Sequence, residues 1–254
     1  MLLAVNADDF GFTAGVNRGI LEAVRCGMVT SVSLMVNQPG TDDAIVILQR
    51  GEMSGVGVGV HLCLTKGSPV SAPAEIPSLV QQDGGFRLRQ ELFVQSPSWT
   101  EVERELAAQI EKVRAAGINI THLDTHHHIH FRPVILSAVI SVACRYHLPV
   151  RNLDPAMRDR FRAEGVATPD YCCLHWFADL ATAEVFRQLV LQGRRTGAGF
   201  MEMMTHPGLA DEELRRLSGY TREREKELEV LCDPQLRQWL QENGVQLGTY
   251  EDLH

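Results

Sequence analysis

Short apolar runs alternate with stretches of helical periodicity along most of the chain, and this alternation constrains the fold more than any other feature. The runs that we expect to form strands are 2–7, 31–36, 56–62, 118–125, 149–153, 200–206 and 245–250. Apolar strands separated by helices pair in parallel, and the helices then cover the outside of the sheet. The sequence therefore predicts an α/β fold, a (β/α) barrel-like fold of the distorted TIM type with seven or eight strands.

Helical spacing and end signals place helices between these strands. We expect helices just after residue 13, over 42–49, from about 98–100 onward, over 133–146, and between 233 and 243. Ser98 and Thr100 are each followed three residues later by a glutamate, which predicts capping boxes. A Pro- and Gly-rich segment, 68–98, is typical of a functional lid or a disordered loop. We see no internal repeat or linker, so 1–254 is expected to be a single domain, although 154–180 shows no clear pattern.

Composition and charge exclude several classes of protein. Hydrophobic residues make up 44% of the chain, enough for a core, and the net charge of −8 comes without a basic stripe. A nucleic-acid backbone is therefore not the expected partner. The N-terminus lacks a basic region, and no apolar stretch approaches the roughly 18 residues of a membrane span. We expect a soluble, cytoplasmic protein whose six scattered cysteines are reduced and mostly buried.

Ionisable residues follow four of the expected strands. These residues are Asp8 and Asp9, His61, the segment 124–126, and His206. In parallel βα folds, and above all in barrels, sites are built at the carboxyl ends of strands. Four strands therefore deliver carboxylates and imidazoles to the same rim, where we expect the functional site.

The segment 121–130, with the sequence THLDTHHHIH, contains five histidines. The period of two in a strand puts Asp124, His126 and His128 on one face and His127 on the other. Alternate residues of such a strand can approach a metal, so His126 or His128 is a candidate ligand. The alternative is a polar strand end with solvated imidazoles.

Asp8 and Asp9 are adjacent carboxylates at the end of an apolar run. Two such groups repel each other, which raises the pKa of one of them unless a cation or a hydrogen-bond donor compensates. A divalent ion would leave one aspartate as ligand and its neighbour as base. The alternative is that they cap the following helix, where negative charge suits the helix dipole.

His61, His206 and Arg151 complete the set of candidates. His61 shares one strand face with Gly57 and Gly59, which leave room for another group to approach closely. By itself it would more often be a satisfied core histidine, but a carboxylate with two imidazoles is a common catalytic metal set. His206 is a candidate general acid or a turn residue before a proline. Arg151 is a candidate for holding a carboxylate or substrate oxygen, or for a surface salt bridge.

At these residues the sequence resembles the YdjC-like carbohydrate deacetylases, which act on chitooligosaccharides. The matching stretches follow the family order over nearly the whole chain, and they are VNADDFG at 5–11, the strand at 30–31, GVHLCLT at 59–65, THLDTHHHIH at 121–130 and MTHP at 204–207. The resemblance implies a barrel-like fold and one divalent metal held by Asp9, His61 and His126.

The wider group of polysaccharide deacetylases shares the paired aspartates, of which the first acts as base and the second binds metal. By that analogy Asp8 is the general base. Those enzymes usually place a second ligand histidine four residues after the first, where this chain has Thr65. The third ligand must then come from elsewhere, and His126 fits the YdjC-like pattern.

The expected function is metal-dependent removal of the acetyl group from an N-acetylated sugar, with release of acetate. Asp8 takes a proton from water, His206 protonates the departing amine, and Asp124 orients a ligand imidazole; His128 and Arg151 are further candidates for supporting the site or binding substrate. Two imidazoles favour Zn²⁺, the family suggests Mg²⁺, and both stay open. Rival readings are an amide or ester hydrolase on another substrate, such as a hopanoid-pathway intermediate, and a non-catalytic sugar-binding protein. The resemblance also suggests a homodimer.

Overall fold

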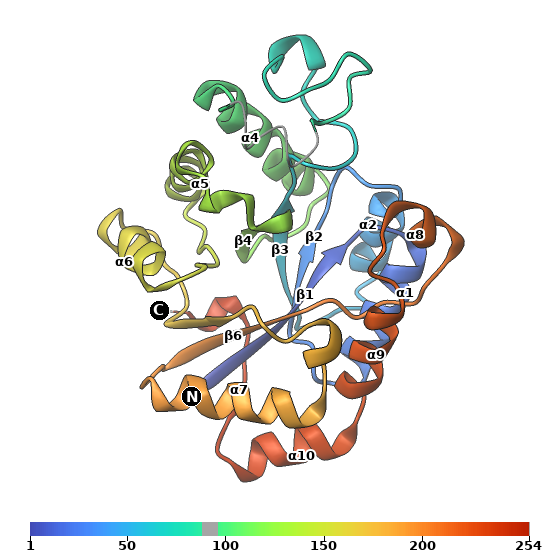
Figure 1. Ribbon diagram of the computed structural model, residues 1–254, viewed down its shortest axis with the longest axis vertical. Helices are drawn as coiled ribbons and strands as arrows, with labels where there is room; N and C mark the ends of the chain where they lie inside the picture. Colours follow the sequence, from blue (N-terminus) through green and yellow to red (C-terminus); the bar gives the residue numbers. More distant parts are fainter. Residues whose placement is uncertain (88–95, 254) are drawn as a thin grey trace.

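One curled parallel sheet lies at the centre of the computed structural model, which describes residues 1–87 and 96–253 (Figure 1). Its strands are β1 (Leu2–Phe10), β2 (Ser31–Leu34), β3 (Gly57–Leu62), β4 (His122–Thr125), β5 (Tyr171–Cys173), β6 (Phe200–Thr205) and β7 (Gln246–Leu247). The order across the sheet is β4-β3-β2-β1-β6-β5, and β7 pairs with the start of β1. All pairings between these strands are parallel, as the alternating sequence pattern predicts.

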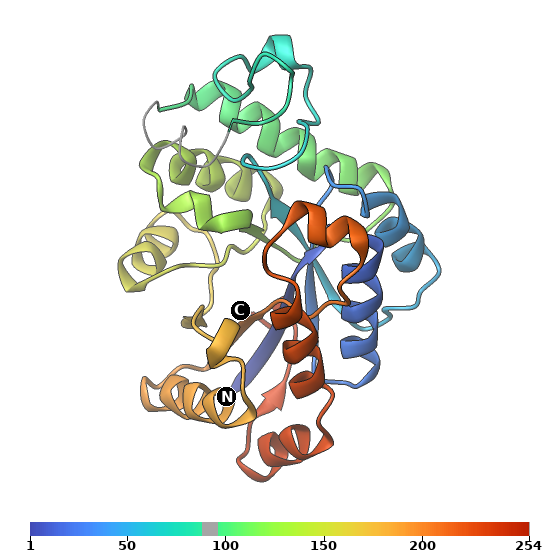
Figure 2. The same ribbon diagram turned by 45° about the vertical axis from the view of Figure 1, so that its right-hand side comes forward.

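Helices cover the outside of this sheet, as Figures 1 and 2 show from two directions. They are α1 (Ala14–Arg25), α2 (Thr41–Gln49), α4 (Trp99–Ala115), α5 (Pro133–Tyr146), α6 (Pro155–Ala163), α7 (Ala183–Arg195), α8 (Glu212–Leu217), α9 (Arg222–Leu231) and α10 (Pro234–Glu242). Short 3-10 helices are η1 (Pro73–Glu75), η2 (His126–Phe131), η3 (Ala178–Leu180) and η4 (Tyr250–Asp252). No helix among the described residues is both long and apolar enough to cross a membrane.

The sheet curls into a barrel-like shape, which confirms the predicted fold class, but β4 and β5 are not paired with each other. The segment 149–153, expected to be a strand, makes one isolated bridge from Val150 to Leu123 of β4. The Asn152 side chain then donates to Thr168 and to the carbonyl of Pro169. These side-chain bonds and one backbone bond, from the Val150 amide to the carbonyl of Ala167, join this segment to the chain before β5, in place of a backbone ladder.

Side chains on the inner face of the sheet are polar near the carboxyl ends of the strands. Asn6, Ser33, His122 and Asp124 are all buried and hydrogen-bonded to one another or to a shared partner. Gly59 makes room for this layer, because a Cβ atom there would lie 2.5 Å from His122 Nε2. The predicted close approach beside this glycine is confirmed. The barrel interior therefore contains a charged and hydrogen-bonded network rather than an apolar core.

One local prediction is wrong, and two segments take a form that the sequence did not specify. Helix α4 begins after Ser98, but the Ser98 side chain makes no capping bond to the backbone, and Glu101 accepts from the amide of Ser78 instead. The segment 154–180, which shows no clear pattern, folds into α6, β5 and η3. The predicted loop 68–98 contains η1, and its part at 88–95 lies outside the described residues.

The cysteines also differ from expectation. Cys26, at the end of α1, forms a disulfide with Cys232, at the end of α9. Both residues are only partly buried, and they lie 206 residues apart in the sequence, so no local spacing signalled the bond. The other four cysteines are free, as predicted, and Cys63 and Cys173 are buried.

Candidate metal centre and active site

An irregularity at the end of β1 brings both aspartates to one site. The register against β2 shifts between Ala7 and Phe10, and Asp9 has a positive φ of 67°. Consecutive strand residues normally point to opposite faces, and a bulge re-aims one of them. Aspartate tolerates this left-handed backbone better than most residues. The side chains of Asp8 and Asp9 therefore both approach His61.

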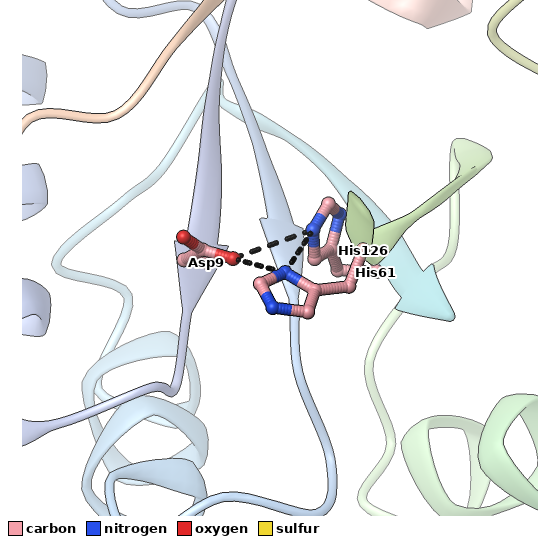
Figure 3. A group of neighbouring side chains, drawn as sticks. All are labelled: Asp9, His61 and His126. Carbon is pink, nitrogen blue, oxygen red and sulfur yellow. Dashed lines mark hydrogen bonds and ion pairs between the residues drawn. The ribbon is translucent and has the colours of Figure 1, made fainter. Parts of the chain in front are cut away.

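Asp9, His61 and His126 converge on one point, as Figure 3 shows. Asp9 Oδ1 lies 2.9 Å from His126 Nδ1 and 3.4 Å from His61 Nε2. The two imidazole nitrogens are 3.3 Å apart. All three side chains are buried. The three residues predicted from the family resemblance thus come from β1, β3 and the first residue of η2, and meet with their ligand atoms facing inward.

Asp124 fixes the orientation of His61. Its Oδ1 lies 2.8 Å from His61 Nδ1, and its Oδ2 accepts from Ser33 and pairs with Arg151. When Nδ1 donates to Asp124, the lone pair of His61 Nε2 faces Asp9. A carboxylate behind a ligand imidazole is the usual support of a metal-binding histidine. The geometry therefore agrees with the expected role of Asp124, which is to accept a hydrogen bond from His61 and so orient its imidazole.

The donor set fits a divalent cation. Asp9 Oδ1 is buried, and within the described chain it receives no hydrogen bond of acceptable geometry, despite the two nitrogens around it. Burial by itself raises the pKa of Asp9, but the charges of Arg224 and His126 hold this pKa well below its ordinary value. An ionised, buried oxygen without a donor, next to two imidazole nitrogens, is what a cation with one carboxylate and two histidine ligands requires.

Asp8 also lies beside His61, but Arg151 binds its carboxylate inside the barrel. The guanidinium donates to both carboxylate oxygens of Asp8, over 2.7 and 2.6 Å. Burial raises the pKa of Asp8, but the Arg151 charge outweighs this and lowers it. Asp8 is therefore ionised and able to accept a proton. Neither aspartate caps α1, whose N-cap is Thr13.

Arg151 is completely buried, so the alternative of a surface salt bridge is wrong. Besides Asp8 and Asp124 it binds Glu202, to which its Nε donates over 2.8 Å. Glu202 in turn accepts from the Tyr250 hydroxyl over 2.5 Å. We call Asp8, Arg151, Asp124, Glu202 and Tyr250 the inner network. Through Arg151, it connects Asp8, the neighbour of the candidate ligand Asp9, to Glu202 of β6 and Tyr250 of η4.

His206 follows β6 and faces Asp8, with 3.8 Å between His206 Nε2 and Asp8 Oδ2. Its backbone amide donates to Glu227 on α9. Burial lowers the pKa of His206 to about 4. The imidazole therefore lies beside Asp8 and lines the pocket that opens onto Asp9, and its role as general acid stays a prediction.

The histidine-rich segment does not continue as a strand. β4 ends at Thr125, and His127 and His128 have positive φ angles of 58° and 53°. The predicted alternation of His126 and His128 on one face therefore fails beyond Thr125. His127 contacts Thr65, the residue at the position where the wider deacetylase group has a ligand histidine. His128 belongs neither to the group of Asp9, His61 and His126 nor to a second group of converging atoms, Asp8, His61 and Asp124. Its Nδ1 is buried without a hydrogen bond from the described residues.

A pocket of about 210 Å³ opens onto Asp9. It is lined by Asp9, Phe12, Lys66, His126, His127, Phe177, His206, Ser218, Tyr220 and Arg224. Phe177 is 43% exposed and offers an aromatic face at this site. The pocket thus combines ligand atoms, a candidate acid, aromatic faces and two cationic side chains.

The sequence analysis missed the contribution of α9. Arg224 donates to Asp9 Oδ2 over 2.5 Å, and Glu227 accepts from the amide of His206. Arg224, Glu227, Leu228 and Leu231 are the buried residues of this helix. Their spacing of three, four and seven residues defines one helical face. In the sequence, this contribution could have been recognised because Arg224 and Glu227 share the helical face of the buried leucines.

The chain belongs to the YdjC-like protein family, whose model matches residues 2–242. It is 39% identical over 257 residues to a carbohydrate deacetylase of Brevibacillus brevis, with 100% of both chains covered. It is 40% identical over 251 residues to a carbohydrate deacetylase of Geobacillus stearothermophilus, covering 98% of this chain and 97% of the relative. The family predicted from the strand-end motifs is confirmed.

Solved structures show the same fold. A protein of Enterococcus faecalis V583, provisionally described as a cellobiose-phosphate cleavage protein, superposes with a TM-score of 0.92 at 31% identity, covering 98% of this chain and 97% of that one. A family 4 acetyl xylan esterase of Clostridium thermocellum has a TM-score of 0.51 at 14% identity, covering 99% and 89%. The second likeness shows a shared fold and nothing further.

Proposed function

We propose that this protein is a metal-dependent carbohydrate N-deacetylase, which hydrolyses the acetamide of an N-acetylated sugar and releases acetate. The observation that carries the proposal is the ligand triad of Asp9, His61 and His126, whose Asp9 Oδ1 is buried without a hydrogen bond from the described residues. The names of the curated relatives point to the same reaction.

Asp9, His61 and His126 would hold the metal. A divalent ion there supplies Lewis acidity towards the acetamide carbonyl and the attacking water. The two imidazoles favour Zn²⁺, whereas the mixed set also admits Mg²⁺.

Asp8 and His206 supply the proton transfers in this proposal. Asp8 accepts a proton from water as the water oxygen bonds to the carbonyl carbon, and Arg151 holds its carboxylate in place. The carbon–nitrogen bond then breaks, and His206 delivers a proton to the departing amine. Because burial keeps the pKa of His206 near 4, its imidazole must gain a proton before it can act. The Asp8 carboxylate 3.8 Å away is positioned to supply one.

The pocket suits a sugar. Phe12, Phe177 and Tyr220 offer aromatic faces, against which the apolar face of a pyranose ring can pack. Lys66 and Arg224 add hydrogen-bond donors for hydroxyl groups. These contacts support an N-acetylated sugar more than a lipid-like hopanoid intermediate, whose large apolar body has no matching surface in a pocket of about 210 Å³.

The test measures acetate release from diacetylchitobiose by metal-stripped protein, before and after addition of Zn²⁺ or Mg²⁺. Release that requires the metal and is lost in Asp9→Ala supports both the reaction and the site. Protein that binds the metal and remains folded, yet releases no acetate from this or other N-acetylated sugars, would exclude the deacetylase assignment. Release of other acyl groups would then favour a different amide or ester hydrolase.

A further inference from the structure

One ring nitrogen of the candidate acid has no partner. His206 Nδ1 is buried and makes no hydrogen bond to any described residue, although Nε2 faces Asp8. A general acid must present its proton from Nε2 towards the substrate, and it is then stabilised when Nδ1–H has an acceptor. The structure therefore lacks one contact that the acid role of His206 demands.

Glu227 is positioned to supply that contact. Its Oε2 accepts from the His206 backbone amide over 2.5 Å, and its Oε1 lies 4.0 Å from His206 Nδ1. The carboxylate is completely buried. A small rotation of the imidazole or of the carboxylate would close the gap to a hydrogen bond of about 2.8 Å.

Neighbouring residues hold Glu227 in this place. The Tyr220 hydroxyl donates to Glu227 Oε1 over 2.5 Å and accepts from the amide of Ala178 over 2.7 Å. Ala178 follows Phe177, which lines the pocket. Arg224, one helical turn before Glu227, contacts both the carbonyl of His206 and Asp9. Helix α9 thus forms hydrogen bonds to both the backbone amide and the backbone carbonyl of His206.

We propose that Glu227 is the positioning residue for His206: it accepts the Nδ1 proton of the imidazole and so keeps Nε2 directed at the departing amine. The proposal rests on the proposed function, because it assigns Glu227 a part in the same hydrolysis. Tyr220 links this pair to the segment that carries Phe177. A sugar packed on Phe177 would therefore lie next to the hydrogen bonds, through Ala178 and Tyr220, that hold Glu227 in place.

The charges around the pair support a shared proton. The groups that face Glu227 are His206, Tyr220, Arg224 and, farther off, Asp8. Burial, only partly offset by these donors, raises the pKa of Glu227 to about 7, whereas burial lowers that of His206 to about 4. At pH 7 Glu227 is therefore about half protonated and the His206 imidazole is neutral, and shortening the 4.0 Å gap would favour transfer of the Glu227 proton to the imidazole.

The first measurement is an NMR titration of the His206 ring in the metal-loaded protein and in Glu227→Gln. Glu229→Gln is the matched control, since it makes the same change at an exposed position of the same helix. If Glu227 faces Nδ1 as proposed, the wild-type ring resonances should report the protonation of Glu227 as a step near its pKa of about 7. Glu227→Gln should lose this step, and the control should keep it. A ring titration in Glu227→Gln that is identical to that of the wild type overturns the proposal, whatever the enzyme activity.

The second measurement compares two leaving groups. Amine departure from an N-acetylated sugar needs a proton, whereas 4-nitrophenolate departure from 4-nitrophenyl acetate does not. Glu227→Gln should lower kcat on the sugar about 10- to 100-fold with little change in KM, move the alkaline limb of the pH profile to lower pH, and spare the ester. Equal losses on both substrates would mean a merely structural role. If wild-type protein releases no acetate from any N-acetylated sugar, the proposed function fails, and the NMR titration still decides the contact.

Discussion

Asp8 and Asp9 are neighbours in the chain, are both buried and have the same chemistry, yet their carboxylate oxygens have different partners. Around Asp8, in the inner network, the guanidinium of Arg151 meets the acceptor oxygens of three carboxylates. Around Asp9, in the ligand triad, the inward-facing oxygen has only two imidazole nitrogens beside it and no hydrogen bond within the described chain. The inner network supplies its own hydrogen-bond donors, whereas the proposed ligand triad keeps one oxygen that a cation would satisfy.

This difference shows how one fold gives two adjacent carboxylates separate roles. A buried carboxylate is stable when donors or opposite charges compensate its desolvation. Arg151 does this permanently for Asp8, which remains an ionised acceptor, while Asp9 is left incomplete on one side. Asp124 joins the two regions, because it binds both Arg151 and His61. Changes in the two regions should therefore have different consequences, and the following predictions rank them.

The largest effect is expected from Asp9→Asn, which removes the charge but tolerates the left-handed backbone of this position. Acetate release should fall about 10³-fold or more, roughly 4 kcal/mol in transition-state stabilisation, and metal affinity should fall with it. Asp8→Asn should also lose activity but keep its metal. Isothermal titration calorimetry with Zn²⁺ distinguishes the two variants. Full metal binding by Asp9→Asn would show that the two regions are not divided as described.

Arg151→Met should cause the second-largest effect, on stability. It leaves three buried carboxylates without their shared cation, a loss of roughly 3–5 kcal/mol in the free energy of unfolding. Arg160→Met removes an exposed pair with Glu164 and should cost less than about 1 kcal/mol. Urea denaturation of both variants provides the comparison. Similar losses would mean that the inner network is no more important than a surface ion pair.

Asp124→Asn tests the residue that joins the regions. Because Asp124 orients His61 without facing the metal position, metal affinity should fall about 10- to 100-fold rather than vanish. Asp42→Asn, at an exposed position of α2, serves as the control and should bind metal normally. An affinity for Zn²⁺ equal to that of wild type would remove Asp124 from the support of His61.

The smallest effect is expected from Tyr250→Phe at the far end of the inner network. Glu202 loses one hydrogen bond but keeps that of Arg151, so the free energy of unfolding should fall by about 1 kcal/mol. Metal affinity should stay within about twofold, because Tyr250 contacts no member of the ligand triad. A large loss of metal affinity would mean that the inner network and the triad act as one unit.

Much of the site was visible in the sequence because strand ends are local features. The apolar runs and the polar residues that follow them predicted β1, β3, β4 and β6, and parallel pairing predicted one common rim. The candidates Asp9, His61 and His206 do meet there. His126 also reaches the rim, but through the turn of η2 rather than as part of a strand. The ligand and catalytic roles of these residues stay predictions until the metal and activity measurements are made.

By itself, the sequence determined the βα order, the family and the rim on which the chemistry gathers, because hydrophobic periodicity and strand-end motifs depend on residues close together in the chain. Only the tertiary structure decided that Asp8 and Asp9 pair with different arginines, Arg151 and Arg224. It also decided that Arg151 is buried among three carboxylates, and that Arg224 and Glu227 reach the site from α9. The physical reason is distance: an ionic or hydrogen-bonding partner acts over a few ångströms in space, and the partners of Asp8 and Asp9 lie 143 and 215 residues away in sequence.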